Sequence, residues 1–522
     1  MDVIVIGAGL NGLVAGAYLA GRRRSVVILD QRPVAGGAAI TTEFVPGYRV
    51  PTLSHSLGPV SREVVRALHL DRAGLEFKMT EPTLTTLGHG GASIVFHRDP
   101  VLTAGSINRL ASSDAVRWSE FLKFTQRVGN VIARLSHQTP PSVDEVPARD
   151  WLRLLRLGRS ARALGRRDLA RVMRWVTMPV ADFAAEWFEH DLLRAALSAQ
   201  AIFGNPVGPM SAGSGGMLLQ RLGLDPHPLG SGATVRGGPG ALTGALVKIA
   251  EKRGATIRTG ARVVRILSRG GQAKGVVLEN GDELTATAVV SAIDPKRTFT
   301  ELVDPVELPS TFLDRIRCLR ARGVTAKINL ALSGPPVLSE FEGDPVPLRG
   351  RLLIAPDVLY LERAYDATKY GEMSRDPWLE VSIPTIIDSS LSDEGHVMSI
   401  YVHFAPRHLR NGTWADKKEE LYRAALRVLA PHMPTLASLI VEREIWTPED
   451  LETQWGLSGG HIFHGELALD QTWIGRPLLG WSQYRTPIDR LFLAGAGSHP
   501  GGGLTGLPGL LAAKTIDRLM RQ

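Results

Sequence analysis

Three glycines near the N-terminus have the spacing of a dinucleotide-binding turn. Gly7, Gly9 and Gly12 follow the apolar run VIVI and open a stretch with helical periodicity, and the next apolar run, SVVILD, ends in Asp30. In such a unit the first glycine allows a tight turn, the second lets the backbone approach a pyrophosphate, and the third lets the helix pack on the strand. Asp30 would accept hydrogen bonds from the ribose of the adenosine half. The pattern predicts a dinucleotide site, although it does not separate FAD from NAD.

A second glycine-rich loop lies close to the C-terminus, in LFLAGAGSHPGGGLTGLPGLLAAKTI. This stretch combines a buried-strand pattern, a loop over residues 498–506 and a final helical run. Glycine costs backbone entropy on folding, so a loop this rich in glycine indicates that a ligand touches the backbone. The N–H groups of the loop and the N-terminus of the helix would favour a group on which negative charge develops.

Four histidines lie near these motifs and could move a proton. His55, His461, His464 and His499 could each do so near neutral pH, because the pKa of an unperturbed imidazole is about 6.5. The alternative for each is a structural histidine whose hydrogen bonds are satisfied. We select His499, which lies inside the glycine loop, His464 and His55 as the candidate catalytic residues.

The middle of the chain supplies elements that could complete the same domain. The pattern over residues 236–294 predicts a helix from Pro239 to Lys252, followed by the strands TIRTGARVVRI, AKGVVL and ELTATAVVSA. Asn280-Gly281 is a strong hairpin signal between the last two strands. We expect a three-stranded meander that returns to a buried strand.

Length and composition restrict the function classes. A chain of 522 residues is too long for one ordinary core, so we expect at least two domains. The net charge is +8, but no zinc spacing, RNA-binding signature or long Lys/Arg block supports a nucleic-acid partner or a metal site. Cys318 is the only cysteine, which excludes an intramolecular disulfide and a CxxC pair. We expect it to be a packed thiol.

Two long uncharged runs and one basic segment bear on membranes. The glycines of residues 3–21, and the proline and glycines of residues 195–220, argue against a signal peptide or a span, and the second run predicts the wall of an apolar cavity. We therefore expect a cytoplasmic protein. Residues 151–176 hold eight arginines and one acid, which predicts two amphipathic helices broken near Gly158 and Gly165. A solvated face is the favoured interpretation of Arg153–Arg174, and docking on an anionic membrane surface is the alternative.

Several of these motifs resemble one flavoprotein family. GAGSHPGGGLTGLPG is similar to the C-terminal FAD motif of the phytoene desaturase-like flavoproteins. GAGLNGLVAGAYLA, GGAAITTEFVPGY and LSGGHIFHGELALDQTW resemble the branch that includes pyridine nucleotide-disulfide oxidoreductase domain-containing protein 2. The resemblance covers about the first sixty residues, residues 192–294, and residue 455 to the end. Two departures stand out: Ala38 follows Gly36-Gly37 where carotenoid desaturases carry arginine, and a single cysteine cannot perform disulfide chemistry.

The resemblance implies an α/β fold, in which a Rossmann-type FAD-binding domain of the glutathione-reductase-like, two-dinucleotide-binding type carries an inserted α+β substrate domain. The implied parts are FAD-binding segments 1–100, 231–300 and 481–522, a helical substrate or lid region 101–230 and a substrate-binding domain 301–480. No second GxGxxG follows a strand, so we expect one FAD and no NAD(P) domain. The implied cofactor-binding residues are Gly7, Gly9, Leu10, Asn11, Gly12, Asp30, Gln31, Arg32, Gly36, Gly37, Ala38, Val263, Ala292, Gly495, Gly497, Gly501, Gly502, Gly503 and Leu504.

The implied activity is that of an FAD-dependent oxidoreductase. It would move a hydride from a hydrophobic, lipid- or isoprenoid-like substrate to flavin N5 and pass the electrons to oxygen or a quinone. A flavin amine oxidase is an alternative that would need an aromatic pair around the amine. A redox-neutral isomerase or saturase and a non-catalytic FAD-binding assembly partner are two further alternatives.

Overall fold

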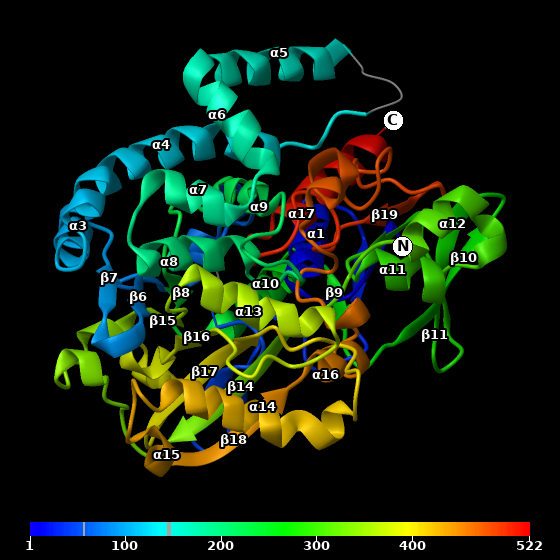
Figure 1. The fold of residues 1–522 in the computed structure, drawn as a ribbon. Coiled ribbons are helices and arrows are strands. Elements are labelled where there is room, and N and C mark those ends of the chain that lie inside the picture. The colour runs from blue at the N-terminus through cyan, green and yellow to red at the C-terminus, as the bar shows by residue number, and fades with distance from the viewer. Residues whose placement is uncertain (56–57, 143–147, 522) are drawn as a thin grey trace.

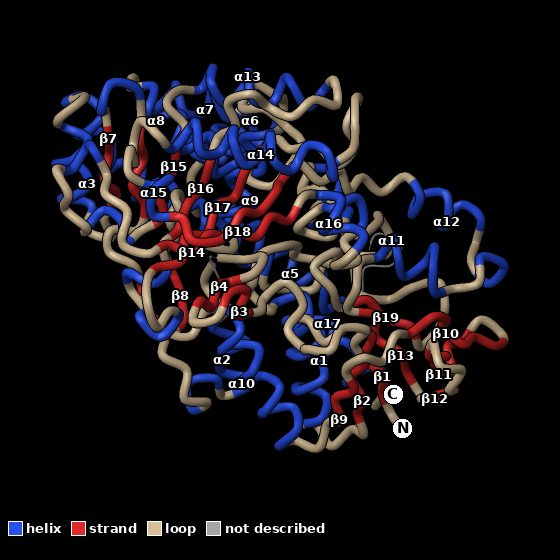
Figure 2. The backbone as a smooth tube through the Cα atoms, turned by 90° about the horizontal axis from the view of Figure 1, so that it is seen from below, coloured by secondary structure: helices blue, strands red, loops and turns tan. Residues whose placement is uncertain are grey.

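The computed structural model describes residues 1–55, 58–142 and 148–521, and its strands form two main sheets (Figures 1 and 2). The first is a five-stranded, all-parallel sheet. Its strands, in spatial order, are β19 (Leu491–Leu493), β13 (Ala288–Ser291), β1 (Val3–Ile6), β2 (Val26–Leu29) and β9 (Thr256–Arg258). Each of β1, β2, β13 and β19 is buried along its whole length, as the continuous apolar runs predict for strands covered on both faces.

Different elements cover the two faces of this sheet. Val3 and Val5 pack in one apolar cluster with the helices α1 (Leu10–Ala20), α10 (Pro239–Lys252) and α17 (Leu507–Leu519). Ile4 and Ile6 point the other way, because successive side chains of a strand alternate, and pack with an antiparallel three-stranded meander. The meander consists of β10 (Val263–Arg269), β11 (Gln272–Leu278) and β12 (Glu283–Thr285).

The predictions for this middle segment are confirmed with two corrections. The helix from Pro239 to Lys252, the β11–β12 hairpin at Asn280-Gly281 and the return to a buried strand are all present. The expected strand TIRTGARVVRI is wrong as a single element, because it divides into β9 and β10, which join different sheets. The expected strand ELTATAVVSA is wrong in the same way, because it divides into β12 of the meander and β13 of the parallel sheet. The non-strand residues 259–262 let the chain leave the parallel sheet and enter the meander.

The second main sheet has seven strands and belongs mostly to the later part of the chain. In spatial order they are β18 (Ile440–Trp446), β14 (Thr325–Leu332), β17 (His396–His403), β16 (Leu379–Ser382), β15 (Arg351–Ile354), β6 (Leu84–Leu87) and β7 (Ser93–Phe96). The β6–β7 hairpin lies within the predicted first FAD-binding segment but joins this sheet through β15. The two sheets and their helices form the α/β fold with an inserted α+β domain that the sequence predicted.

The strand period gives the seven-stranded sheet one apolar and one polar face. Ile328 and Leu330 of β14 pack in an apolar cluster with residues of α14 (Trp414–Leu429). The alternate residues Thr325 and Lys327 point to the opposite face, where they line a cavity. A strand that is buried on both faces can therefore present polar groups to an interior site.

Most of residues 100–222 is helical, and these helices cover the polar side of the seven-stranded sheet (Figure 1). They are α3 (Pro100–Asn108), α4 (Ser112–Ser136), α5 (Ala148–Arg162), α6 (Arg166–Thr177), α7 (Val180–Trp187), α8 (Asp191–Ile202) and α9 (Ser214–Leu222). An aromatic cluster that includes Trp118, Phe121, Trp175 and Phe183 packs α4, α6 and α7 together. As predicted, the uncharged run 195–220 is broken between helices and contributes residues to a cavity wall.

The remaining short elements connect these layers. They are β3 (Thr41–Val45), β4 (Tyr48–Pro51), α2 (Arg62–Leu68), β5 (Phe77–Met79), β8 (Ala233–Val235), α11 (Pro295–Arg297), α12 (Ser310–Arg317), α13 (Val358–Lys369), α15 (Leu436–Leu439) and α16 (Pro448–Thr453).

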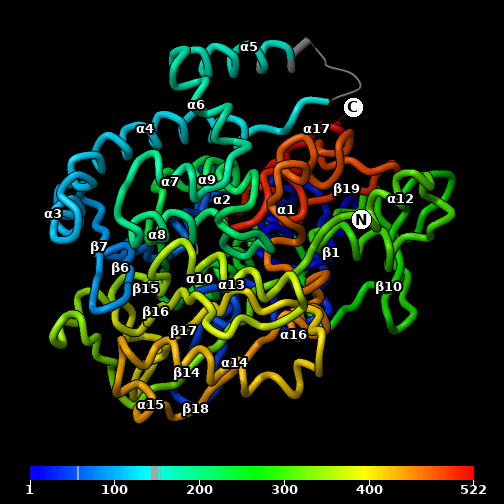
Figure 3. Tube along the Cα trace, in the orientation of Figure 1, coloured from blue at the N-terminus to red at the C-terminus, as the bar shows by residue number. Residues whose placement is uncertain are grey.

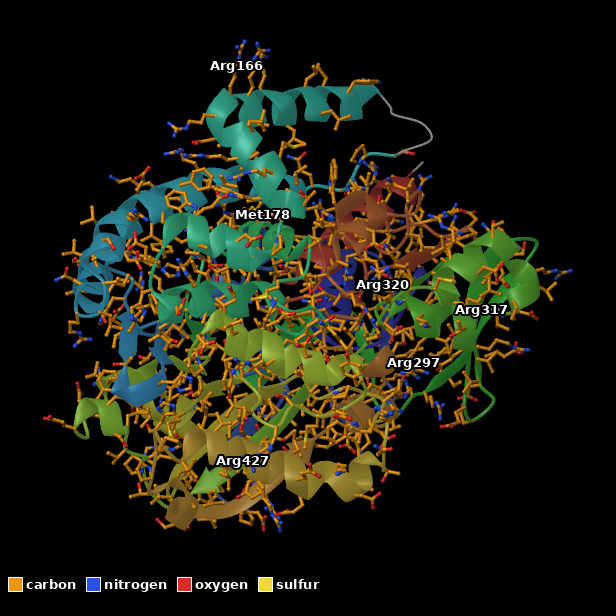
Figure 4. The ribbon with its side chains drawn as sticks, in the orientation of Figure 1. Arg166, Met178, Arg297, Arg317, Arg320 and Arg427 are labelled. Atoms are coloured by element: carbon orange, nitrogen blue, oxygen red, sulfur yellow. The ribbon has the colours of Figure 1, made fainter. Side chains whose placement is uncertain are left out.

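The basic helices α5 and α6 form the outermost layer, beyond α4 (Figure 3). The predicted break near Gly158 is wrong, because α5 runs through it and only Gly165, with φ of +85°, interrupts the pair. A glycine inside a helix costs only about 1 kcal/mol, whereas a positive φ strongly favours glycine. Arg166 projects away from the protein (Figure 4), and Trp151 and Leu155 are exposed on α5. Membrane contact through Arg153–Arg174 stays a prediction.

Two further expectations concern exposure. The prediction that Cys318 is a packed thiol is wrong: it follows the last residue of α12 and is exposed, because that helix buries the face formed by Phe312, Leu313 and Ile316. Within the described residues, no helix combines the length and the apolar character that a membrane span requires.

Candidate functional site

A cavity lies between the carboxyl ends of β1 and β2 and the polar face of the seven-stranded sheet. In open α/β sheets, ligands bind at the carboxyl ends of the strands. Most of the predicted cofactor-binding residues line this cavity: Gly7, Gly9, Leu10, Asn11, Asp30, Gln31, Arg32, Gly36, Gly37, Ala38, Val263, Ala292, Gly502, Gly503 and Leu504. The N-terminal glycine motif and the C-terminal glycine loop, far apart in sequence, therefore meet at one site.

The other predicted glycines lie behind the lining and allow close packing. A Cβ on Gly12 would lie 1.9 Å from the carbonyl oxygen of Gly7, so α1 can pack on the turn only with glycine there. A Cβ on Gly495 would lie 2.6 Å from the carbonyl oxygen of Ala292, and one on Gly497 would lie 2.2 Å from Cδ of Pro295. Gly501 is also outside the lining.

Asp30 holds the turn that forms the floor of this cradle. Its Oδ2 accepts a hydrogen bond from the Ala8 N–H at 2.7 Å, and its Oδ1 accepts one from the Arg32 N–H at 2.9 Å. Burial raises the pKa of the Asp30 carboxyl, and these two backbone hydrogen bonds oppose the shift. Each carboxylate oxygen can accept a second hydrogen bond, so Asp30 can also bind a ribose hydroxyl from the cavity.

The cradle fits a dinucleotide. Gly9 and Gly37 expose bare backbone to the cavity, and the Arg32 guanidinium stacks on Trp455 at 3.4 Å from the ring centroid. The buried Nη1 of Arg32 has no hydrogen-bond partner among the described residues, so it is free to donate to a bound phosphate or ribose. Trp455 also lines the cavity and was missed in the sequence, since nothing but proximity in space connects it to the glycine motif.

Alanine at Gly9 and at Gly12 should separate cofactor binding from folding. For Gly9→Ala we expect the folded protein to lose most of its bound FAD, because the new Cβ has its nearest heavy atom 3.8 Å away in the protein but points into the pyrophosphate cradle. For Gly12→Ala we expect lower stability, because its Cβ clashes with backbone. Flavin absorbance and the midpoint of urea unfolding measure the two effects. A stable Gly9→Ala protein with full flavin content would contradict the assignment.

At the other end of the cavity, side chains of the seven-stranded sheet and His55, from the loop after β4, form a cluster of buried polar groups. Nζ of Lys327 lies 2.8 Å from Nδ1 of His55 and 4.1 Å from the ring centroid of Tyr401. Nε2 of His55 lies 3.2 Å from Oε1 of Glu380, whose Oε2 accepts a hydrogen bond from Arg351 at 2.7 Å. We name Lys327, His55, Glu380 and Arg351 the buried polar chain. Lys327, Glu380 and Tyr401 line the cavity.

The protonation states in this chain follow from its hydrogen bonds. Burial would raise the pKa of the Glu380 carboxyl, but Arg351 and the hydrogen bond from His55 outweigh it and hold that pKa below its usual range. An ionised Glu380 can only accept, so His55 donates from Nε2 and offers Nδ1 as an acceptor to Lys327. Burial lowers the pKa of His55 to about 3 and lowers the pKa of Lys327 well below its usual value. Burial therefore shifts Lys327 towards the uncharged amine, whose lone pair could accept a proton.

Of the buried polar chain, the sequence analysis identified only His55. Lys327 interrupts the apolar run TAKINLAL, and an isolated lysine inside a buried strand is the one signal that could have identified it. Glu380 and Arg351 also lie in apolar runs, but their partners are unrelated in sequence.

The three candidate catalytic histidines occupy different places. His55 belongs to the buried polar chain, and His464 lines the cavity with its buried Nδ1 lacking a partner among the described residues. Burial lowers the pKa of His464. His499 is not among the lining residues, and its Nε2 lies 3.1 Å from the carbonyl oxygen of Leu135 in α4. The structure therefore does not bring His499 together with the other two. His461 is buried and its Nδ1 accepts from the Phe463 N–H.

Stability should fall as the pH drops below about 6.5. Burial lowers the pKa of His55, His403 and His461 to about 3 and that of His499 to about 4, whereas the unfolded chain binds protons near pH 6.5. Unfolding then takes up protons, so the stabilisation is complete above pH 6.5 and is lost towards pH 4, by up to about 1.4 kcal/mol per pH unit for each histidine. Urea midpoints between pH 7.5 and 5 measure it. His403→Gln should reduce the slope by about one proton, and exposed His89→Gln should not; a flat profile would contradict this prediction.

The chain is similar to known flavoproteins over its whole length. The family model described as flavin containing amine oxidoreductase matches residues 10–509. Pyridine nucleotide-disulfide oxidoreductase domain-containing protein 2 of Rattus norvegicus is 32% identical, over 99% of this chain and 93% of the relative. Phytoene desaturase (neurosporene-forming) of Cereibacter sphaeroides is 26% identical, over 97% and 92%.

A solved structure agrees on the fold. Cyclohexylamine oxidase from Brevibacterium oxydans superimposes with a TM-score of 0.60 at 16% identity, covering 100% of this chain and 99% of that one. The glycine cradle, the two-sheet architecture and these full-length matches lead to the same assignment. The chain belongs to the flavin-containing amine oxidoreductase family, in the phytoene desaturase-like branch of pyridine nucleotide-disulfide oxidoreductase domain-containing protein 2, and is an FAD-dependent oxidoreductase.

Proposed function

We propose that this oxidoreductase dehydrogenates a largely apolar, lipid- or isoprenoid-like substrate, with Lys327 as the base. The observation that carries the proposal is the buried amine of Lys327 at the cavity surface, 2.8 Å from Nδ1 of His55, where burial lowers the pKa of Lys327 well below its usual value. A base must have its lone pair available at neutral pH, and burial provides this for a lysine.

The atoms and electrons balance as follows. FAD held by the glycine cradle and Asp30 would supply the acceptor for a hydride from a substrate C–H bond. Lys327 accepts a proton from the neighbouring carbon, and the electron pair left behind forms a carbon–carbon double bond. The resulting ammonium group can donate to Nδ1 of His55, while ionised Glu380 stabilises the added positive charge through His55. The final electron acceptor in this proposal is oxygen or a quinone.

The cavity wall around Lys327 supports a substrate that is mostly hydrocarbon. Apolar side chains from the helical segment and the loops line the same cavity as Lys327: Leu53, Ala201, Phe203, Met217, Leu224, Ile462, Phe463 and Leu467. The phytoene desaturase among the relatives acts on a compound of this class, as its name states.

Amine oxidation is the alternative that shares the cofactor and the family. It would favour two aromatic rings that face each other across the amine. Phe203 and Tyr401 form one aromatic pair at the cavity, and they pack edge to face, with centroids 5.4 Å apart and an interplanar angle of 87°. Phe203 also packs with Phe463, with centroids 6.3 Å apart and an interplanar angle of 44°, so these rings do not face each other in parallel either. Because the rings of Phe203 and Tyr401 touch, they leave no gap for an amine between them, which favours dehydrogenation of carbon.

The experiment is a visible spectrum of the purified holoenzyme under anaerobic conditions. A total lipid extract of the producing organism is expected to bleach the flavin, and a panel of primary and secondary amines is not. Bleaching by amines alone would replace the proposal with amine oxidation. A flavin that neither addition bleaches would favour the redox-neutral or non-catalytic alternatives.

A further inference from the structure

An arginine without an ion pair lies at the substrate end of the cavity. Arg221, near the C-terminal end of α9, lines the cavity, and within the described residues it forms no ion pair. Its Nη1 donates to the carbonyl oxygen of Gln200 at 3.3 Å, and its guanidinium carbon lies 5.6 Å from the centroid of Phe203. A guanidinium has five N–H donors, so most of the hydrogen-bonding capacity of Arg221 is unused.

An unsatisfied amide lies beside this arginine. Gln200, on α8, is 1% exposed and also lines the cavity. Neither Nε2 nor Oε1 of its side chain has a hydrogen-bond partner among the described residues. An amide buried without partners costs free energy, so a polar group that binds in the cavity is expected to satisfy it.

The surrounding charges do not neutralise Arg221 by direct contact. Glu380 is already paired with Arg351 and hydrogen-bonded to His55. Asp225 accepts hydrogen bonds from the backbone N–H groups of His227 and Ser231. Burial lowers the pKa of Arg221 and Arg351 adds repulsion, while Glu380 and Asp225 act in the opposite direction. Among the described residues no carboxylate pairs directly with Arg221, so a bound anion could make that contact.

We propose that Arg221 and Gln200 bind a carboxylate group of the substrate, so that the protein oxidises an amphiphilic acid rather than a pure hydrocarbon. A carboxylate supplies one negative charge and can form bidentate hydrogen bonds with the planar guanidinium. Phe203 and the apolar lining between Arg221 and Lys327 contact the hydrocarbon part. This inference rests on the proposed function and deepens it, because it names the polar end of the substrate whose C–H bond lies near Lys327.

The test measures binding to the oxidised holoenzyme, without turnover. The probes are straight-chain carboxylates of four to sixteen carbons, decyl phosphate and decanol. The flavin difference spectrum and calorimetry measure the binding of each probe. The variants are Arg221→Met and Gln200→Leu. The matched control is Arg127→Met, which removes an equal charge from a surface pair with Asp168, where the arginine side chain is 55% exposed.

We expect at least one carboxylate to bind the wild type and Arg127→Met equally. Arg221→Met should weaken the binding of that carboxylate by about 10- to 100-fold, because hydrogen bonds to charged groups contribute on this scale. The same substitution should leave the affinity for decanol unchanged. Gln200→Leu should reduce the affinity for the carboxylate by a smaller factor. Tighter binding of decyl phosphate than of any carboxylate, equal binding to Arg221→Met, or no carboxylate binding at all would overturn the inference. Loss of FAD from Arg221→Met would also overturn it, by assigning the arginine to the cofactor.

This result is independent of the bleaching experiment. If carboxylates bind through Arg221 but no lipid bleaches the flavin, the anion site stands and the proposed dehydrogenation fails. If bleaching substrates lack a carboxylate and Arg221→Met leaves their KM unchanged, the dehydrogenation stands and the anion site fails.

Discussion

Replacing Lys327 with methionine is expected to slow substrate-dependent bleaching of the flavin by about 10²- to 10³-fold, because a positioned general base contributes on this scale. The methionine retains an unbranched, apolar stem in the buried position and removes the amine that accepts the proton. Because burial favours the uncharged form of Lys327, an apolar replacement suits the site. The FAD content should remain that of the wild type. Anaerobic stopped-flow absorbance with the lipid substrate measures the rate.

The pH profile gives this prediction a second readout. Burial lowers the pKa of Lys327, so the wild-type bleaching rate should rise with pH through that lowered pKa and reach a plateau below the pH range in which an exposed lysine titrates. The Lys327→Met rate should lack this step. Lys274→Met, on the exposed side of β11, is the matched control and should behave as the wild type. A Lys327→Met protein that bleaches within threefold of the wild type would remove Lys327 from the mechanism.

The cofactor half of the molecule could be predicted because its signals are local. Gly7, Gly9 and Gly12 lie in one turn, and the physical demand on each is set by its immediate neighbours. Asp30 follows at the end of the next strand, where the βαβ unit brings it back to the Ala8 N–H. The distant loop at Gly502 and Gly503 was also identifiable, because a glycine-rich stretch between a buried strand and a helix by itself indicates that a ligand touches the backbone.

The substrate half could not be predicted in the same way, since its residues are single polar side chains in apolar runs. His55 and Lys327 are 272 positions apart and Arg351 and Leu229 are 122 apart, yet they form direct hydrogen bonds. The tertiary fold brings such residues together, because His55 and Leu229 lie in loops that pack against strands of the seven-stranded sheet. Position in the sequence also gave no orientation for His499, whose side chain contacts α4 rather than the cavity.

Glu380→Gln is expected to lower the free energy of unfolding by about 3–5 kcal/mol, because removing one partner leaves the other charge buried and unpaired. The Glu380 and Arg351 side chains are 1% and 7% exposed, and Arg351 also donates to the carbonyl oxygen of Leu229. The surface control is Glu419→Gln. Its pair with Arg443 has side chains 43% and 37% exposed, so it should change stability by less than about 1 kcal/mol. Urea unfolding of the holoenzyme at pH 7.5, followed by tryptophan fluorescence, measures both.

A double substitution distinguishes an unpaired charge from a simple packing defect. Glu380→Leu with Arg351→Met removes both charges and fills similar volume, so it should recover much of the stability that Glu380→Gln loses. If the double variant is no more stable than Glu380→Gln, packing rather than charge explains the loss. Glu380→Gln should also slow bleaching while Lys327 is intact, because the carboxylate stabilises the positive charge that Lys327 gains. Full bleaching activity in Glu380→Gln would confine the glutamate to a structural role and leave Lys327 to act without the rest of the buried polar chain.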